Sequence, residues 1–169
     1  HKAISNKKSN SWSFINSGFN LRPTDITASI GNSQLKKLKK ISSIRQHNFK
    51  LIRKALLDDK RYSHKFDIIE ESLGNKIIWF GIPIILKSTD KNYKNKVTNK
   101  LNKFGIDTRP LISGNFANQP AVKLYKLKIN SNLKNANFID KYSFFIGLHN
   151  TKTNNKTINY IKKAFYASL

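Results

Sequence analysis

The stretch Lys76–Lys87, with the sequence KIIWFGIPIILK, is the clearest β-strand candidate in this chain. It consists mainly of β-branched and aromatic residues, which are enriched in strands. Pro83 lacks a backbone N–H group, so we expect this strand to lie at a sheet edge or to contain a bulge. The chain is therefore expected to contain a β-sheet.

Helical and extended patterns alternate on both sides of this strand. Before it, apolar residues recur from Ile26 to Leu56, mostly three to five residues apart, which predicts one long helix that ends near Asp58. Gly105 stands where a glycine commonly ends a helix. The other expected elements are a short strand within 66–69, a helix over 93–104, a strand over 106–113, short helices over 120–125 and 135–140, a strand over 142–147 and a helix over 154–167.

This order of elements predicts an α/β fold in which helices cover a small sheet of three to four strands. We expect residues 1–17 to form a polar arm, 18–59 an interdomain segment with the long helix, and 60–169 an α/β small domain. The long helix would span roughly 50 Å at ~1.5 Å per residue. Such a length predicts a helix that bridges two bodies.

The composition excludes several classes of protein. With 38% hydrophobic residues and no apolar run near the ~20 residues of a membrane span, the chain is expected to be soluble and globular. The lack of cysteine excludes disulfides, thiolate metal sites and a thiol nucleophile, and the four scattered histidines predict no metal site. The chain begins with His1 and contains no methionine, so we expect a fragment, a processed product or a trimmed polypeptide.

The formal net charge of +23 raises the possibility of a polyanion-binding module. However, only five of the 32 basic residues are arginines, and nucleic-acid readers favour arginine. The chain also holds 21 asparagines and 21 isoleucines, as an A/T-rich coding bias would produce. Lysines gathered on one face beside aromatic residues would favour binding of nucleic acid or an anionic surface, whereas scattered lysines would favour an enzyme domain.

Four segments together resemble one family. They are GFNLRPTDITASIGNSQLKKL, which begins at Gly18, WFGIPIILK at Trp79–Lys87, GIDTRPLISGNF at Gly105–Phe116, and NLKNANFIDKYSFFIGLHN at Asn132–Asn150. In this order they resemble the fold-type-I pyridoxal-phosphate enzymes that act on nucleotide sugars, the DegT/StrS-like family. The similarity is strongest to the branch of GDP-4-keto-6-deoxymannose 3-dehydratases and related lipopolysaccharide 3-dehydrases.

The resemblance implies that the chain is the C-terminal small domain of a larger cytoplasmic enzyme, together with its connecting helix. That enzyme would be a homodimer that uses pyridoxal 5'-phosphate on a nucleotide-linked 4-keto-6-deoxysugar, by C3 dehydration or by transamination, in lipopolysaccharide deoxysugar synthesis. The family's cofactor-bearing segment would precede His1. The resemblance therefore implies no catalytic residue in this chain, no bound cofactor and no activity in isolation.

Six residues are the candidate site residues. The resemblance assigns Asn20 to the cofactor phosphate, and it assigns Arg22, Arg109, Asn115, Phe116 and His149 to the substrate. Five of them have a structural alternative: a turn residue for Asn20, a surface charge for either arginine, a core residue for Phe116 and a structural histidine for His149. If the family assignment holds, Arg109 and Asn115 should lie at one end of the sheet with His149 nearby, and apolar residues of the long helix should be exposed. A purely structural domain would leave these side chains far apart.

Overall fold

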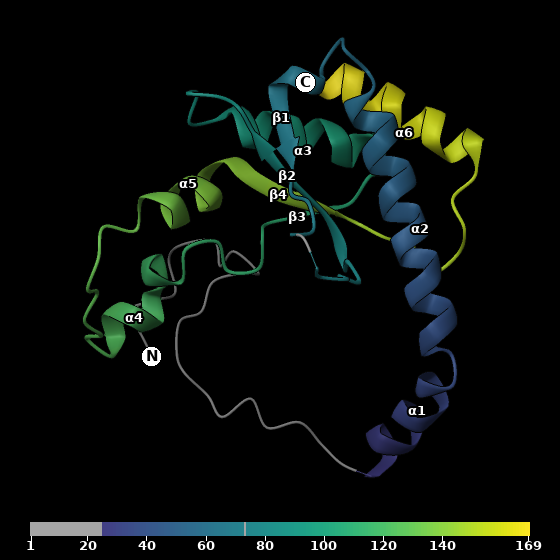
Figure 1. Cartoon of the computed structure of the whole chain (residues 1–169). Coiled ribbons are helices and arrows are strands. Elements are labelled where there is room, and N and C mark those ends of the chain that lie inside the picture. Colours follow the sequence, from purple (N-terminus) through teal and green to yellow (C-terminus); the bar gives the residue numbers. More distant parts are fainter. Residues whose placement is uncertain (1–24, 73) are drawn as a thin grey trace.

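The computed structural model describes residues 25–72 and 74–169 (Figure 1). Among these residues, no helix is both long and apolar enough to cross a bilayer. The expected arm at 1–17 lies outside them, and the division of the chain into domains stays a prediction. The helices and strands are α1 (Asp25–Leu35), α2 (Leu38–Leu57), β1 (Phe66–Ile68), β2 (Gly81–Leu86), α3 (Tyr93–Lys103), β3 (Thr108–Arg109), α4 (Pro120–Leu124), α5 (Lys134–Tyr142), β4 (Ser143–Gly147) and α6 (Asn155–Ser168).

The four strands form one antiparallel sheet in the order β1-β2-β4-β3. The β2–β4 pair is the longest and runs from Gly81 opposite Gly147 to Ile85 opposite Ser143. The α/β fold class and the small sheet of three to four strands are confirmed, although β3, which pairs with β4, contains only two residues.

The position of Pro83 corrects the expectation of an edge strand or a bulge. β2 lies inside the sheet, and its register with β4 is continuous, with Pro83 opposite Phe145. β1 reaches only as far as the pair of Ile68 with Ile84, so within the described residues Pro83 has a neighbouring strand on one side alone. A proline is tolerated in a strand where one flank carries no ladder.

β2 is also shorter than the Lys76–Lys87 stretch predicted it to be. It begins only at Gly81, whereas Ile78 and Phe80 before it are 48% and 64% exposed. A Cβ atom at position 81 would collide with the ring of Phe145 and the carbonyl oxygen of Ile146. Glycine therefore allows β4 to approach β2 at the point where the strand starts.

One face of the sheet carries the core. Ile82, Ile84 and Leu86 alternate along β2 and are completely buried. They belong to one cluster with Phe144 and Ile146 of β4, and with apolar residues of α2, α3 and α6, which close over this face. Burial of each large apolar side chain contributes about 1.5–3 kcal/mol relative to its exposure, so this layer provides much of the stability of the fold.

The expected single long helix is instead two helices, α1 and α2. A turn at 36–37 separates them, with the N–H of Lys37 donating to the carbonyl of Gln34 at 2.9 Å. Ile30 and Leu35 are five residues apart, which takes Leu35 off the stripe that Ile26 and Ile30 begin. None of the residues of α1 is buried, and it extends away from the sheet in Figure 1. The expected exposure of apolar residues here is confirmed, since Ile26 is 74% and Ile30 58% exposed.

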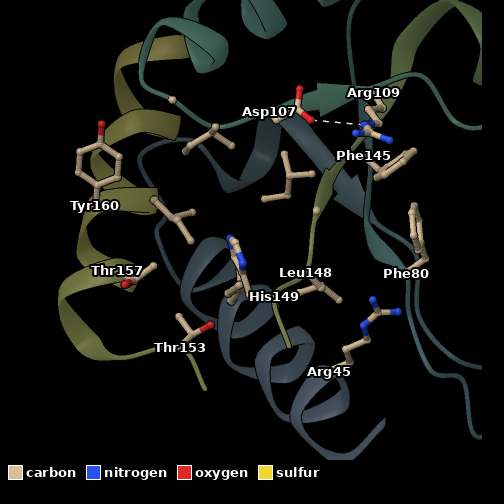
Figure 2. A pocket seen from close by; sticks show the side chains of 16 residues that line it. Arg45, Phe80, Asp107, Arg109, Phe145, Leu148, His149, Thr153, Thr157 and Tyr160 are labelled. Atoms are coloured by element: carbon tan, nitrogen blue, oxygen red, sulfur yellow. Dashed lines mark hydrogen bonds and ion pairs between the residues drawn. The ribbon is translucent and has the colours of Figure 1, made fainter. Parts of the chain in front are cut away.

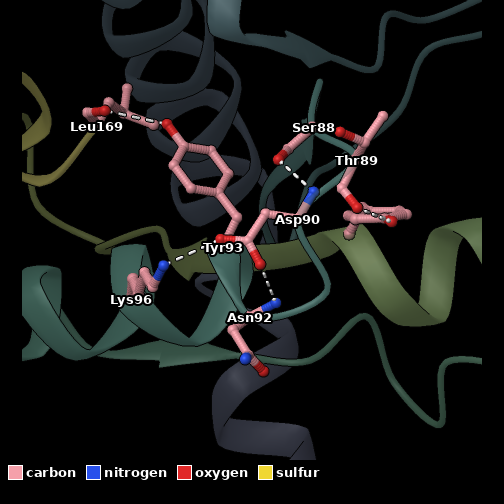
Figure 3. A network of polar contacts seen from close by, with 8 residues as sticks. Ser88, Thr89, Asp90, Asn92, Tyr93, Lys96 and Leu169 are labelled. Carbon is pink, nitrogen blue, oxygen red and sulfur yellow. Dashed lines mark hydrogen bonds and ion pairs between the residues drawn. The ribbon is translucent and has the colours of Figure 1, made fainter.

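The connection from β2 to α3 is held by a polar network (Figure 3). The side chain of Asp90 accepts a hydrogen bond from the N–H of Asn92 at 2.8 Å and pairs with Lys96 at 3.0 Å. The hydrogen bond from Asn92 and the contact with Lys96 lower the pKa of the Asp90 carboxyl. The carboxylate therefore stabilises the turn that starts α3.

Asp59 anchors the end of α2 to α6. Its buried carboxylate accepts hydrogen bonds from Arg61 at 2.8 and 2.6 Å and lies 3.8 Å from Lys162 of α6. The Arg61 guanidinium also lies over the ring of Tyr166, 4.4 Å from its centre. The hydrogen bonds from Arg61 lower the pKa of Asp59 from 3.8 to about 2.

Asp59 should therefore make the stability of the fold depend on pH in acid. Because its pKa is lower in the folded chain, its contribution is complete above pH 3.8 and is lost as the pH falls towards about 2. We expect Asp59→Asn to lower the free energy of unfolding near neutral pH by about 1.5–3 kcal/mol. Urea unfolding should show that this difference between the variant and the wild type shrinks below the ordinary pKa of aspartate.

Asp67→Asn, which removes the exposed ion pair with Lys87, is the control and should change the free energy of unfolding little. A constant difference between Asp59→Asn and the wild type across this pH range would contradict the assignment.

Candidate functional site

A pocket of about 560 Å³ opens at the end of the sheet where β3 and β4 meet α2 and α6 (Figure 2). Its walls come from the end of β4, the connection from β4 to α6, the segment before β3, and the facing sides of α2 and α6. The polar lining residues are Arg45, Asp107, Arg109, His149, Thr153 and Thr157, and the aromatic ones are Phe80, Phe145 and Tyr160.

Arg109 reaches this pocket from β3, at the rim. Its Nε atom lies 3.4 Å from the Asp107 carboxylate, and both side chains are well exposed. An exposed ion pair of this kind stabilises a fold by about 0–1 kcal/mol, so the pair adds little to stability. It does place a guanidinium and a carboxylate together at the pocket entrance.

Arg45 of α2 is the second arginine of the pocket. Its Nε donates to the side-chain oxygen of Asn150 at 2.9 Å, and its guanidinium lies 5.9 Å from the centre of the Phe80 ring. Phe80 in turn contacts Phe145 edge to face, with 5.7 Å between the ring centres. In Figure 2 these two rings lie between Arg45 and Arg109. Two guanidinium groups beside an aromatic pair suit an anionic ligand that also carries a planar group.

His149 lies on the connection that follows β4. Asn48 of α2 holds this connection. Asn48 is completely buried. Its side-chain nitrogen donates to the carbonyl oxygens of His149 at 3.1 Å and Thr151 at 2.8 Å, and its side-chain oxygen accepts from the N–H of Thr153 at 2.9 Å. Asn48 thus bonds α2 to the backbone of one pocket wall.

Asn115 and Phe116 do not line the pocket. Asn115 is buried, accepts from the N–H of Ala117 at 3.1 Å and donates to the side chain of Asn137 at 2.8 Å. Asn118 donates to the same Asn137 oxygen at 3.1 Å, so this turn is attached to α5. Phe116 is half exposed.

The structure therefore brings Arg109 and His149 to one pocket, as expected, but places Asn115 and Phe116 on a separate turn that is attached to α5. Asn20 and Arg22 lie outside the described residues. Contact of any of these residues with a cofactor or a substrate stays a prediction.

Sequence reasoning missed Arg45, Asn48 and Asp107. Asn48 does carry a signal, because it lies four residues from both Ile44 and Ile52, on the apolar stripe of α2. A polar residue on such a stripe is buried and requires hydrogen-bond partners. The sequence does not reveal that those partners belong to a connection about 100 residues away.

The pocket does not fit pyridoxal phosphate. No lysine lines it, and its single carboxylate, Asp107, faces Arg109 at the exposed rim. Enzymes of this cofactor commonly hold it with a lysine and pair its ring nitrogen with an acidic or basic group. Within 25–72 and 74–169, no group of three or more His, Cys, Asp or Glu side chains is placed to hold a metal ion either.

Comparison with known proteins gives consistent matches. A sequence model described as the DegT/DnrJ/EryC1/StrS aminotransferase family matches residues 1–165. The chain is 31% identical over 140 residues to GDP-4-keto-6-deoxy-D-mannose 3-dehydratase of Escherichia coli O55:H7, which covers 82% of this chain and 34% of that protein. It is 28% identical over 138 residues to the lipopolysaccharide biosynthesis protein RfbH of Salmonella typhimurium. This match covers 82% of this chain and 31% of that protein.

A solved structure of GDP-4-keto-6-deoxymannose-3-dehydratase with bound GDP-perosamine superimposes with a TM-score of 0.71 at 28% identity. The match covers 94% of this chain and 41% of that one. The chain thus spans about a third of the length of the curated relatives it matches.

Gly114 controls the turn that carries Asn115. Its φ angle is +61°, and a Cβ atom there would collide with the carboxylate of Asp140 in α5. We expect Gly114→Ala to lower the free energy of unfolding by about 1–3 kcal/mol and to shift the NMR signals of the Asn115 and Asn118 side-chain amides. Gly31→Ala is the matched control, since nothing lies within 4 Å of a Cβ atom there. Equal stability of the two variants would show that this turn is not packed on α5.

Proposed function

This chain belongs to the DegT/DnrJ/EryC1/StrS aminotransferase family, and we propose that it forms the small domain of a pyridoxal-phosphate-dependent enzyme. The proposed substrate is a nucleotide-linked 4-keto-6-deoxysugar, and the proposed reaction is dehydration at C3 or transamination. The product would serve deoxysugar synthesis for lipopolysaccharide. We further propose a cytoplasmic homodimer.

The similarity to GDP-4-keto-6-deoxy-D-mannose 3-dehydratase carries this proposal, because it extends over 82% of the chain. The family model matches residues 1–165, which include the segments that form the pocket. The pocket supports a nucleotide as the ligand. A diphosphate is a good partner for guanidinium groups, and a base can stack on aromatic rings.

The chain's own contribution would be binding and orientation of the substrate. Arg109 and Arg45 would neutralise the diphosphate beside the Phe80–Phe145 pair, and His149 would donate a hydrogen bond at the pocket wall. Because the pocket does not fit the cofactor, pyridoxal phosphate would be held elsewhere in the complete enzyme.

The remaining candidate residues keep their proposed roles. Asn20 would contact the cofactor phosphate of the other subunit, and Arg22 would contact the substrate, in a pocket that is shared across the dimer. Asn115 would act from the turn attached to α5, where the half-exposed Phe116 could form a wall against the substrate. The exposed apolar residues of α1 support an interface with another part of the enzyme.

The complete enzyme with added pyridoxal phosphate and an amino donor tests the proposed reaction. Mass spectrometry of the product from GDP-4-keto-6-deoxymannose should show loss of the C3 hydroxyl for a dehydratase, or gain of an amino group for an aminotransferase. We expect Arg109→Gln to raise KM at least about tenfold, the equivalent of about 1.4 kcal/mol of binding.

Lys123→Gln is the control for this experiment, because it removes the same charge from α4, away from the pocket lining. The proposal fails if the wild-type enzyme converts no nucleotide-linked 4-keto sugar. An unchanged KM in Arg109→Gln would remove the role proposed for Arg109 alone.

A basic module for nucleic acid or an anionic surface is the alternative function, and the net charge of +23 favours it. The positions of the lysines favour an enzyme domain instead. Every helix from α2 to α6 carries an exposed lysine, for example Lys39, Lys96, Lys123, Lys134 and Lys156.

Binding of mixed-sequence DNA separates these two functions. If the positive charge only reflects an A/T-rich coding bias, fluorescence anisotropy should detect weak DNA binding that is independent of sequence and falls steeply with salt. Sub-micromolar affinity at about 0.2 M salt, with a preference for one sequence, would instead support the nucleic-acid function.

A further inference from the structure

The connection from β4 to α6 is attached to α2 mainly through the side chain of Asn48. Strand pairing of β4 ends at Gly147, and α6 begins at Asn155. Among the described residues, no backbone–backbone hydrogen bond involves 149–153. The carbonyls of His149 and Thr151 and the N–H of Thr153 all bond to the side chain of Asn48 instead.

Only an amide of this length meets these three requirements together. The contacts need two donated hydrogen bonds and one accepted bond from a single short side chain. Aspartate has no N–H to donate, serine has one hydroxyl, and glutamine is one methylene longer. The complete burial of Asn48 makes loss of these bonds costly, because buried polar groups would then lack partners.

Asn48 itself does not line the pocket, whereas His149 and Thr153 do. Arg45, three residues before Asn48 on α2, also lines the pocket and bonds to Asn150 of the same connection. α2 therefore holds this wall by two side chains on one face, separated by about one helical turn.

We propose that Asn48 is a positioning residue, which fixes the backbone of 149–153 so that His149 and Thr153 keep their places in the pocket wall. The expected loss of nucleotide affinity in a variant of Asn48 rests on the proposed function. The expected loss of backbone order in 149–153 does not depend on that function.

Hydrogen exchange of the full 169-residue chain tests the positioning directly. In the wild type, the amide of Thr153 should exchange at least about tenfold more slowly than in an unstructured peptide, because a buried side chain accepts its hydrogen bond. Asn48→Ala should remove this protection and leave the protection of Ile146 in β4 unchanged. Rapid exchange of Thr153 in the wild type would overturn the inference, whether or not Asn48→Ala folds.

Titration with GDP then tests the effect on the pocket. We expect Asn48→Ala to weaken GDP binding about tenfold, the equivalent of about 1.4 kcal/mol. Val97→Ala is the matched control, because Val97 is completely buried in the core and absent from the pocket lining. It should lower the unfolding midpoint and leave the GDP affinity and the protection of Thr153 unchanged.

The outcomes separate this inference from the proposed function. Wild-type GDP affinity in Asn48→Ala, or an equal loss of affinity in Val97→Ala, would overturn the inference. If the wild-type chain does not bind GDP, the nucleotide assignment of the pocket fails. The positioning role is then decided by Thr153, and is supported only if protection is lost in Asn48→Ala and retained in Val97→Ala.

Discussion

Close contact between β2 and β4 is the constraint on which the rest of the structure depends. The absence of a side chain at Gly81 lets the Phe145 ring and the Ile146 carbonyl approach the start of β2, and five residue pairs then align in register. That alignment places Ile82, Ile84 and Leu86 on the same face as Phe144 and Ile146, where α2, α3 and α6 cover them. It also determines where β4 ends, and therefore where the pocket opens.

Most of the elements could be predicted from local patterns, because hydrophobic period and turn residues report on local structure. The errors arose where a distant neighbour decides the outcome. Pro83 is accepted inside the sheet because β1 stops one residue short of it. The predicted strand start at Lys76 was wrong because the residues before Gly81 find no partner strand among the described residues. The predicted single long helix was wrong because a turn at 36–37 divides it, and no residue of α1 is buried.

The candidate site shows the same division between local and distant information. Family resemblance and the positions of the strand ends predict Arg109 and His149 as site residues, and the structure places both at one pocket. Arg45 and Asn48 were not selected, because their roles depend on residues more than 100 positions later. Asn115 was selected as a contact residue, yet its amide is used to attach its own turn to α5. Whether a polar side chain faces a ligand or its own backbone is a tertiary property.

The independence of α1 from the core has a consequence for how this family can diversify. An 11-residue helix is marginal in water by itself, and α1 has no buried side chain to compensate for this. Substitutions at Ile26 or Ile30 therefore leave the packing of the sheet and its covering helices intact. The residues of α1 and of any surface that α1 contacts in a larger assembly can therefore change together without changes in the core. The break at 36–37 separates a region whose substitutions spare the core from a region whose substitutions alter it.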